Sequence, residues 1–168
     1  MRAEPRLTRD ADIAVLVADD TGAEALVRSL QERGWRVIAT VEHESARRLA
    51  TIRLAEAGAD ARGQVVDLLF ASSGVEPEIV AAAEAIEIVP GFVVPVARAG
   101  HLIALKVLAR DDRTRPQDRV DLAALLRDVE AATLDEARAA LALIERRGFA
   151  RQRSLGVALE AALEEFRS

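Results

Sequence analysis

Two nearly adjacent aspartates, and a third inside a later apolar run, are the residues of this chain best suited to hold a metal ion. Asp10 and Asp12 stand where the apolar run 12–17 begins, and residues two apart in a β-strand project from the same face. Neighbouring carboxylates repel each other unless a cation lies between them, and oxygen ligands of this kind suit Mg²⁺ or Mn²⁺. An Asp-x-Asp pair alone is more often a solvated strand start, so a metal site needs a third ligand.

Asp67 is the candidate third ligand, because it interrupts the otherwise apolar run 64–70. A carboxylate inside such a run is costly to bury unless it is paired or coordinates a metal. The alternative is that Asp67 lies on a solvent-facing edge. Together with the Asp-x-Asp pair it would form a three-carboxylate site, which could hold two metal ions and stabilise the attacking and leaving oxygens of phosphoryl transfer.

Basic residues with acidic neighbours occur later in the chain. Lys106 is the only lysine, and Arg110 follows it by four residues on a predicted helix, so the two share a face. Asp118 and Asp121 lie three apart on the next predicted helix. We interpret Lys106 as a phosphate contact, with the two aspartates holding the basic side chains in place. The alternative is that these charges only join two helices through modest salt bridges.

Thr51 and Arg53 share one face of a predicted strand. An arginine beside an acidic metal centre could bind a triphosphate tail or the phosphate of an acceptor. In so arginine-rich a chain, a surface role is the commoner explanation. His43 and His101 are isolated and the chain has no cysteine, so the sequence does not indicate zinc or a disulfide framework.

The elements that must position these residues follow from hydrophobic periodicity and turn signals. A helix capped by Thr21, with Glu24 completing a capping box, should end at Gly34. The strand at 64–70 should be central, because nearly every residue in it is apolar. The other predicted strands are 12–17, 35–41, 49–55, 86–89 and 92–96, and the other predicted helices are 76–87, 99–110, 116–128, 133–147 and 153–167.

Strands first and helices last predict an α+β fold, with a mixed β-sheet, flanking helices and a helical C-terminal part. We expect an α/β core over residues 1–97 and a helical region over 98–168 packed on it. The 51% hydrophobic and 30% charged residues are typical of a globular protein, and no apolar run approaches membrane-spanning length. We therefore expect a cytoplasmic protein with no membrane partner. The net charge of -5 argues against an indiscriminate nucleic-acid binder.

Four segments, in this order, resemble the AbiEii/AbiGii-type toxin family within the DNA polymerase β-like nucleotidyltransferase superfamily. They are PRLTRDADIAV, RLATIRL, VVDLLF and HLIALKVLARDDRTRPQDRVDL, and the resemblance covers about residues 2–125. It implies a nucleotidyltransferase-like sheet that transfers a nucleotide from an NTP to an acceptor, with an RNA end as a candidate acceptor and a cognate antitoxin as a candidate partner. The resemblance implies Mg²⁺ ligands at Asp10, Asp12 and Asp67, the threonine-x-arginine segment at Thr51 and Arg53, and the late lysine and acidic motif at Lys106, Asp118 and Asp121.

The superfamily also places a glycine-serine or glycine-glycine turn shortly before the Asp-x-Asp. Here nine residues precede Asp10, and the first glycine is Gly22. We expect enzymatic activity if the missing turn is supplied. Two alternatives stay open: a catalytically inert relative that binds a nucleotide, RNA or a partner protein, and a purely structural module whose acidic motifs are solvated faces.

Overall fold

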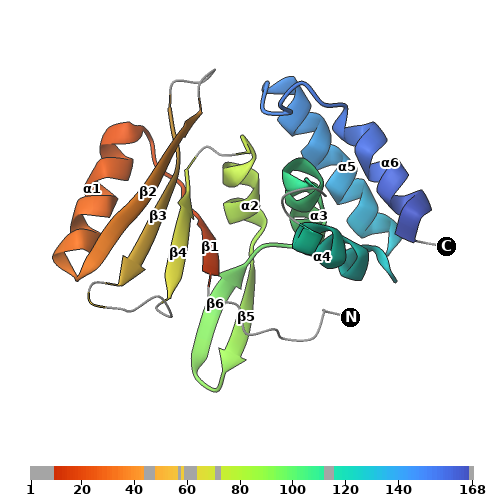
Figure 1. Cartoon of the computed structure of the whole chain (residues 1–168). Coiled ribbons are helices and arrows are strands. Elements are labelled where there is room, and N and C mark those ends of the chain that lie inside the picture. Colours follow the sequence, from red (N-terminus) through yellow and green to blue (C-terminus); the bar gives the residue numbers. More distant parts are fainter. Residues whose placement is uncertain are drawn as a thin grey trace. The chain divides into compact units, whose positions relative to one another are not determined.

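The computed structural model describes residues 10–43, 48–56, 58, 64–70, 73–111 and 116–166. They form two compact units that divide between residues 72 and 73. The unit with the predicted metal ligands is sheet-based, and the other contains a hairpin and most of the helices (Figure 1). Every described element from Ala99 onward is a helix. The division into an α/β core over residues 1–97 and a helical region over 98–168 packed on it stays a prediction.

The first unit is a mixed four-stranded sheet with the order β1-β4-β3-β2. Strand β1 is parallel to β4, whereas β3 is antiparallel to both β4 and β2. The strands are β1 Asp10–Ala14, β2 Trp35–His43, β3 Arg48–Glu56 and β4 Val65–Leu69. Because β4 has a partner on each side, the prediction of a central strand at 64–70 is confirmed.

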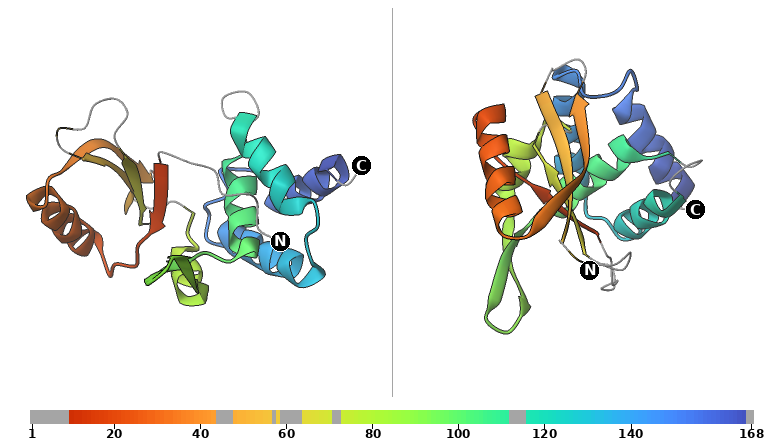
Figure 2. Two further views of the ribbon diagram at one scale, coloured as in Figure 1. Left: turned by 90° about the horizontal axis from the view of Figure 1, so that it is seen from below. Right: turned by 60° about the vertical axis from the view of Figure 1, so that its left-hand side comes forward.

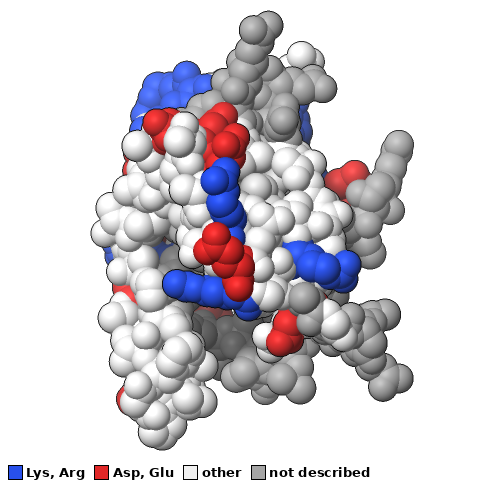
Figure 3. Space-filling model, turned by 90° about the vertical axis from the view of Figure 1, so that its left-hand side faces the viewer, with Lys and Arg blue, Asp and Glu red and all other residues white. Residues whose placement is uncertain are grey.

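Helix α1, Asp20–Glu32, covers one face of this sheet (Figures 1 and 2). Ala23 and Val27 of α1 pack in one apolar cluster with the buried side chains of Ile52, Leu54, Leu68 and Phe70. Strand alternation places the intervening residues, including Arg53 and Asp67, on the opposite face. The outward side of α1 carries exposed residues of both signs, Glu24, Arg28 and Glu32, and Figure 3 shows acidic and basic side chains next to one another on this face.

The predicted cap of α1 is wrong. The N-cap is Asp19, whose carboxylate accepts a hydrogen bond from the Gly22 N–H at 2.9 Å. Aspartate caps a helix better than threonine, so the helix begins just before Thr21 rather than after it. Its end is as predicted, because Gly34 has a φ of +93°, a left-handed conformation that glycine adopts readily.

The second unit begins with α2, Glu76–Ala82, followed by a two-stranded hairpin of β5, Glu84–Val89, and β6, Phe92–Val96. The helix predicted to reach residue 87 ends earlier, because the β-branched residues that follow pair with β6. Four helices complete the unit: α3 Ala99–Ala109, α4 Pro116–Leu126, α5 Ala131–Arg146 and α6 Leu155–Phe166. The predicted α+β class and the helical C-terminal part are confirmed.

Helices α4, α5 and α6 pack around α3, as Figure 2 shows. Each contributes side chains with no more than 1% exposure, at helical spacing. These are Ile103 and Val107 of α3, Leu122 and Leu126 of α4, Leu141 and Ile144 of α5, and Leu155 and Leu159 of α6. This core fixes α3 and α4, the helices that carry Lys106 and the two later aspartates.

Candidate functional site

Two of the predicted metal ligands are direct neighbours across parallel strands. Asp12 of β1 pairs with Asp67 of β4 in the register of the sheet, so both belong to the face opposite α1. Asp10 stands two positions earlier in β1, where its backbone pairs with Val65, and its side chain lies outside the described part of the structure. The sheet therefore brings Asp12 and Asp67 together from segments 55 positions apart in the sequence.

Arg53 of β3 holds Asp67 from the other side. The two residues are in register, and the guanidinium donates from Nε to Oδ1 at 2.8 Å and from Nη2 to Oδ2 at 2.6 Å. This two-point contact explains how a charged residue with 9% exposure is tolerated within an apolar strand. Thr51 occupies the same face of β3, opposite Leu69. The acidic face, defined here as Asp12, Thr51, Arg53 and Asp67, thus spans three adjacent strands.

The chemistry of these residues fits a divalent cation. Mg²⁺ is held in proteins by one or two carboxylates, with water and substrate phosphates completing its octahedral shell. Arg53 engages both oxygens of Asp67, but each carboxylate oxygen keeps a second lone pair. Within the described residues, no group of three or more histidine, cysteine, aspartate or glutamate residues could hold a metal ion. Of the three predicted ligands, the structure describes the side chains of Asp12 and Asp67, and all three remain predictions.

Lys106 of α3 lies between two aspartates of α4 in the second unit. Its Nζ donates to Asp118 Oδ1 at 2.7 Å and to Asp121 Oδ2 at 3.1 Å. Burial lowers the pKa of Lys106, but these hydrogen bonds outweigh that effect, so the pKa lies above the ordinary value of a lysine. The lysine is thus a firmly protonated point charge, with about one third of its side chain exposed.

Arg110 does not join this cluster, although it follows Lys106 by one helical turn. Its guanidinium pairs with Glu165 of α6 at 2.8 Å and lies 5.5 Å from the centre of the Phe166 ring. Arg119 of α4 donates to the same carboxylate at 2.7 Å. Glu165 therefore links α3 and α4 to the end of α6.

Sequence reasoning missed the direct pairing of Arg53 with Asp67 and the bridging role of Glu165. Strand register, which decides the first pairing, is not visible in a single sequence. Spacing offers no signal for the second, because Glu165 lies 55 residues from Arg110.

The sequence model of the family described as nucleotidyl transferase AbiEii toxin, type IV TA system, matches residues 1–167. The chain belongs to this family of nucleotidyltransferase toxins. The family model spans both the acidic face and the group formed by Lys106, Asp118 and Asp121. The resemblance seen in the four sequence segments is confirmed. No curated protein matches the AbiEii-family chain. Within its described residues, no helix has the length and apolar character needed to cross a bilayer.

Proposed function

We propose that this AbiEii-family protein is a Mg²⁺-dependent nucleotidyltransferase, also able to use Mn²⁺, that transfers a nucleotide from an NTP to an RNA acceptor. It would act in the cytoplasm as the toxin of a toxin–antitoxin pair. The observation that carries the proposal is the register of Asp12 with Asp67, which places two carboxylates side by side on one sheet face. In a nucleotidyltransferase family, such a pair is suited to a metal that binds the triphosphate.

In the reaction, an acceptor hydroxyl releases its proton to water as its oxygen attacks the α-phosphorus of the NTP. The bond to the β-phosphate oxygen breaks, and pyrophosphate leaves. A bound Mg²⁺ supplies orientation of the phosphates and neutralisation of their charge. Arg53 keeps the carboxylate of Asp67 in one orientation through its two hydrogen bonds. Lys106, held by Asp118 and Asp121, supplies a fixed positive charge for a phosphate of the nucleotide.

A catalytically inert relative that binds nucleotide or RNA is the second candidate. The observation in its favour is that Arg53 already neutralises Asp67 through both carboxylate oxygens. A guanidinium in that position supplies positive charge of the kind a metal would otherwise provide.

Labelling with NTPs that carry ³²P at the α-phosphate tests the proposal. Protein to which the missing glycine-serine turn has been supplied should, with Mg²⁺ and a pool of cellular RNA, give labelled RNA. Replacement of Asp10 and Asp12 by asparagine keeps the side-chain shape but removes the negative charges, so labelling should fall by orders of magnitude. If this protein binds Mg²⁺ and NTP but labels no acceptor, the inert relative is favoured. If it binds neither Mg²⁺, NTP nor RNA, both candidates are refuted.

A further inference from the structure

The loop between α5 and α6 contains a turn whose two central residues are conformationally strained. Arg151 and Gln152 have φ angles of 53° and 59°, and the Arg153 N–H donates to the Ala150 carbonyl at 3.0 Å. Two consecutive positive φ angles with this hydrogen bond are the pattern of a type I′ turn, in which Asn-Gly is strongly preferred. An Arg-Gln pair carries a conformational cost there that Asn-Gly would avoid.

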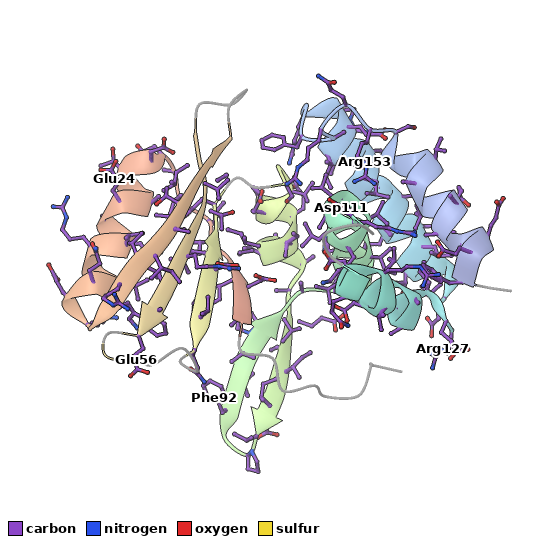
Figure 4. All side chains as sticks on the ribbon, viewed as in Figure 1. Glu24, Glu56, Phe92, Asp111, Arg127 and Arg153 are labelled. Carbon is purple, nitrogen blue, oxygen red and sulfur yellow. The ribbon has the colours of Figure 1, made fainter. Side chains whose placement is uncertain are left out.

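Side chains on both sides of the turn fasten the loop to the rest of the second unit. Nη1 of Arg153 donates to the carbonyls of Leu108 and Arg110 at 3.1 and 3.3 Å, at the end of α3 (Figure 4). Arg147 forms a two-point contact with Glu78 at 2.7 and 2.9 Å. These anchors hold the strained turn in place, so its two central side chains are presented from a fixed backbone.

The loop is locally positive in a chain whose net charge is -5. Four of the eight residues 146–153 are arginines, and two of these are the anchors. The other two, Arg146 and Arg151, are exposed, and no carboxylate of the described residues lies within ion-pair distance of either. The adjacent Glu145 accepts hydrogen bonds from the first N–H groups of α6 instead, at 2.5 and 3.4 Å.

We propose that Arg146, Arg151 and Gln152 form a contact for the phosphate backbone of the RNA acceptor, an inference that rests on the proposed function for the existence of that acceptor. A guanidinium binds phosphate through two parallel hydrogen bonds, and the glutamine amide can donate to phosphate or to a ribose hydroxyl. An Asn-Gly pair would relax the turn but would lack the arginine and glutamine side chains. Their contact with phosphate accounts for the strain that the turn retains. The loop is fastened to α3, the helix that carries Lys106.

Fluorescence anisotropy with a fluorescein-labelled, mixed-sequence single-stranded RNA tests this contact, in EDTA and without NTP. The variant Arg151→Asn/Gln152→Gly carries the preferred turn sequence, so its Tm should rise above that of wild type. Its RNA affinity should nevertheless fall several-fold. The slope of log affinity against log salt should become shallower by about 0.7, as expected for one lost phosphate contact to a single strand.

Two matched variants separate charge from strain. Gln152→Gly alone relaxes the turn but keeps Arg151, so its Tm should rise while the salt slope stays that of wild type. Arg127→Asn removes the same charge from an exposed arginine that follows α4 (Figure 4), and its RNA affinity should equal that of wild type.

The proposal is overturned if wild type does not bind the RNA, or if the double variant keeps the affinity and salt slope of wild type. A Tm of the double variant below that of wild type would show that Arg151 and Gln152 do not strain the turn. Displacement of the labelled RNA by poly-L-glutamate as readily as by unlabelled RNA would assign the loop to an acidic protein instead. Because the assay contains neither metal nor NTP, its failure leaves the labelling experiment for nucleotidyl transfer unaffected.

Discussion

Arg53 and Asp67 have unequal exposure, and this inequality determines what loss of either side chain would do. Asp67 is 12% exposed at its side chain, whereas the side chain of Arg53 is 44% exposed. Removal of the arginine therefore leaves a nearly buried carboxylate without its two charge-assisted hydrogen bonds, and removal of the aspartate leaves a guanidinium that water can still reach.

We expect Arg53→Ala to lower the free energy of unfolding by about 1–3 kcal/mol, the typical cost of an unsatisfied buried acceptor. Added Mg²⁺ should restore part of that loss, because a cation bound at Asp67 would compensate the same charge. Urea denaturation with and without Mg²⁺ measures both effects. Arg36→Ala is the control, since Arg36 is an exposed residue of β2 without an ion pair among the described residues. A Mg²⁺ effect of equal size in wild type, Arg53→Ala and Arg36→Ala would argue against a cation at this face.

Lys106 offers a test in alkaline solution. The chain has one lysine, no tyrosine and no cysteine, so among its side chains only Lys106 titrates between about pH 9 and pH 12. Its pKa is raised in the folded state, so the stabilisation is complete below the ordinary lysine pKa and is lost as pH rises through the folded pKa.

The free energy of unfolding of wild type should therefore fall by about 1 kcal/mol across that range, the scale of a partly exposed ion pair. Lys106→Met should show no such decline, because nothing is left to deprotonate. Urea titrations at a series of pH values provide the measurement. Parallel declines in the two proteins would mean that the contacts with Asp118 and Asp121 do not stabilise the fold.

At the scale of elements, hydrophobic periodicity predicted the four strands of the first sheet and the last four helices. Boundaries were less well predicted where two local preferences compete. Asp19 and Thr21 are both capping residues, and the stronger one caps α1. The helix predicted over residues 76–87 ends at Ala82, because the β-branched residues that follow pair with β6.

The candidate site was predictable as a set of residues but not as a set of contacts. Asp67 was a candidate because a charged residue interrupts an apolar strand, and this signal can be read from a single sequence. Strand register decides that Arg53 is the partner of Asp67. The packing of α6 decides that Arg110 pairs with Glu165. Tertiary packing decides both pairings, so local patterns cannot reveal them.

Gly74, which precedes α2, tests the packing of the α5–α6 loop against the start of the second unit. A Cβ at Gly74 would lie 2.5 Å from Cδ2 of Phe149, and its φ is +76°. We expect Gly74→Ala to lower the free energy of unfolding by about 3 kcal/mol, from the left-handed backbone and the overpacking together.

Gly34→Ala is the matched control for that variant. Gly34 has a φ of +93° with nothing within 4 Å of the added Cβ, so only the backbone cost of about 1 kcal/mol should appear. Urea denaturation of both variants gives the difference, which reports the contact with Phe149. Equal losses would show that Phe149 moves aside without cost.

At the scale of the whole molecule, the proposed metal ligands and the proposed phosphate contact belong to different units. The carboxylates of the acidic face belong to the unit that ends at residue 72, and Lys106 belongs to the unit that begins at residue 73. Substitution of Lys106 should therefore weaken triphosphate binding without changing metal binding, whereas substitution of Asp12 should weaken metal binding and, with it, the contact of the metal with the triphosphate.

Lys106→Ala should cost more free energy of NTP binding than free energy of unfolding. The reason is that it removes the fixed positive charge proposed to contact a phosphate. Isothermal titration calorimetry with an NTP gives the affinity, and urea denaturation gives the free energy of unfolding. Affinity equal to that of wild type would leave Lys106 as a salt bridge between α3 and α4 only.

The presence of a divalent metal at the acidic face is the central claim, and Mn²⁺ binding followed by electron paramagnetic resonance tests it most directly. Asp12→Asn removes one exposed carboxylate, and Asp128→Asn removes a like charge from an exposed position after α4. We expect wild type and Asp128→Asn to bind Mn²⁺ equally, Mg²⁺ to displace the bound Mn²⁺, and Asp12→Asn to lose most of the binding. Equal Mn²⁺ binding in Asp12→Asn and wild type, or none in wild type, would contradict the central claim.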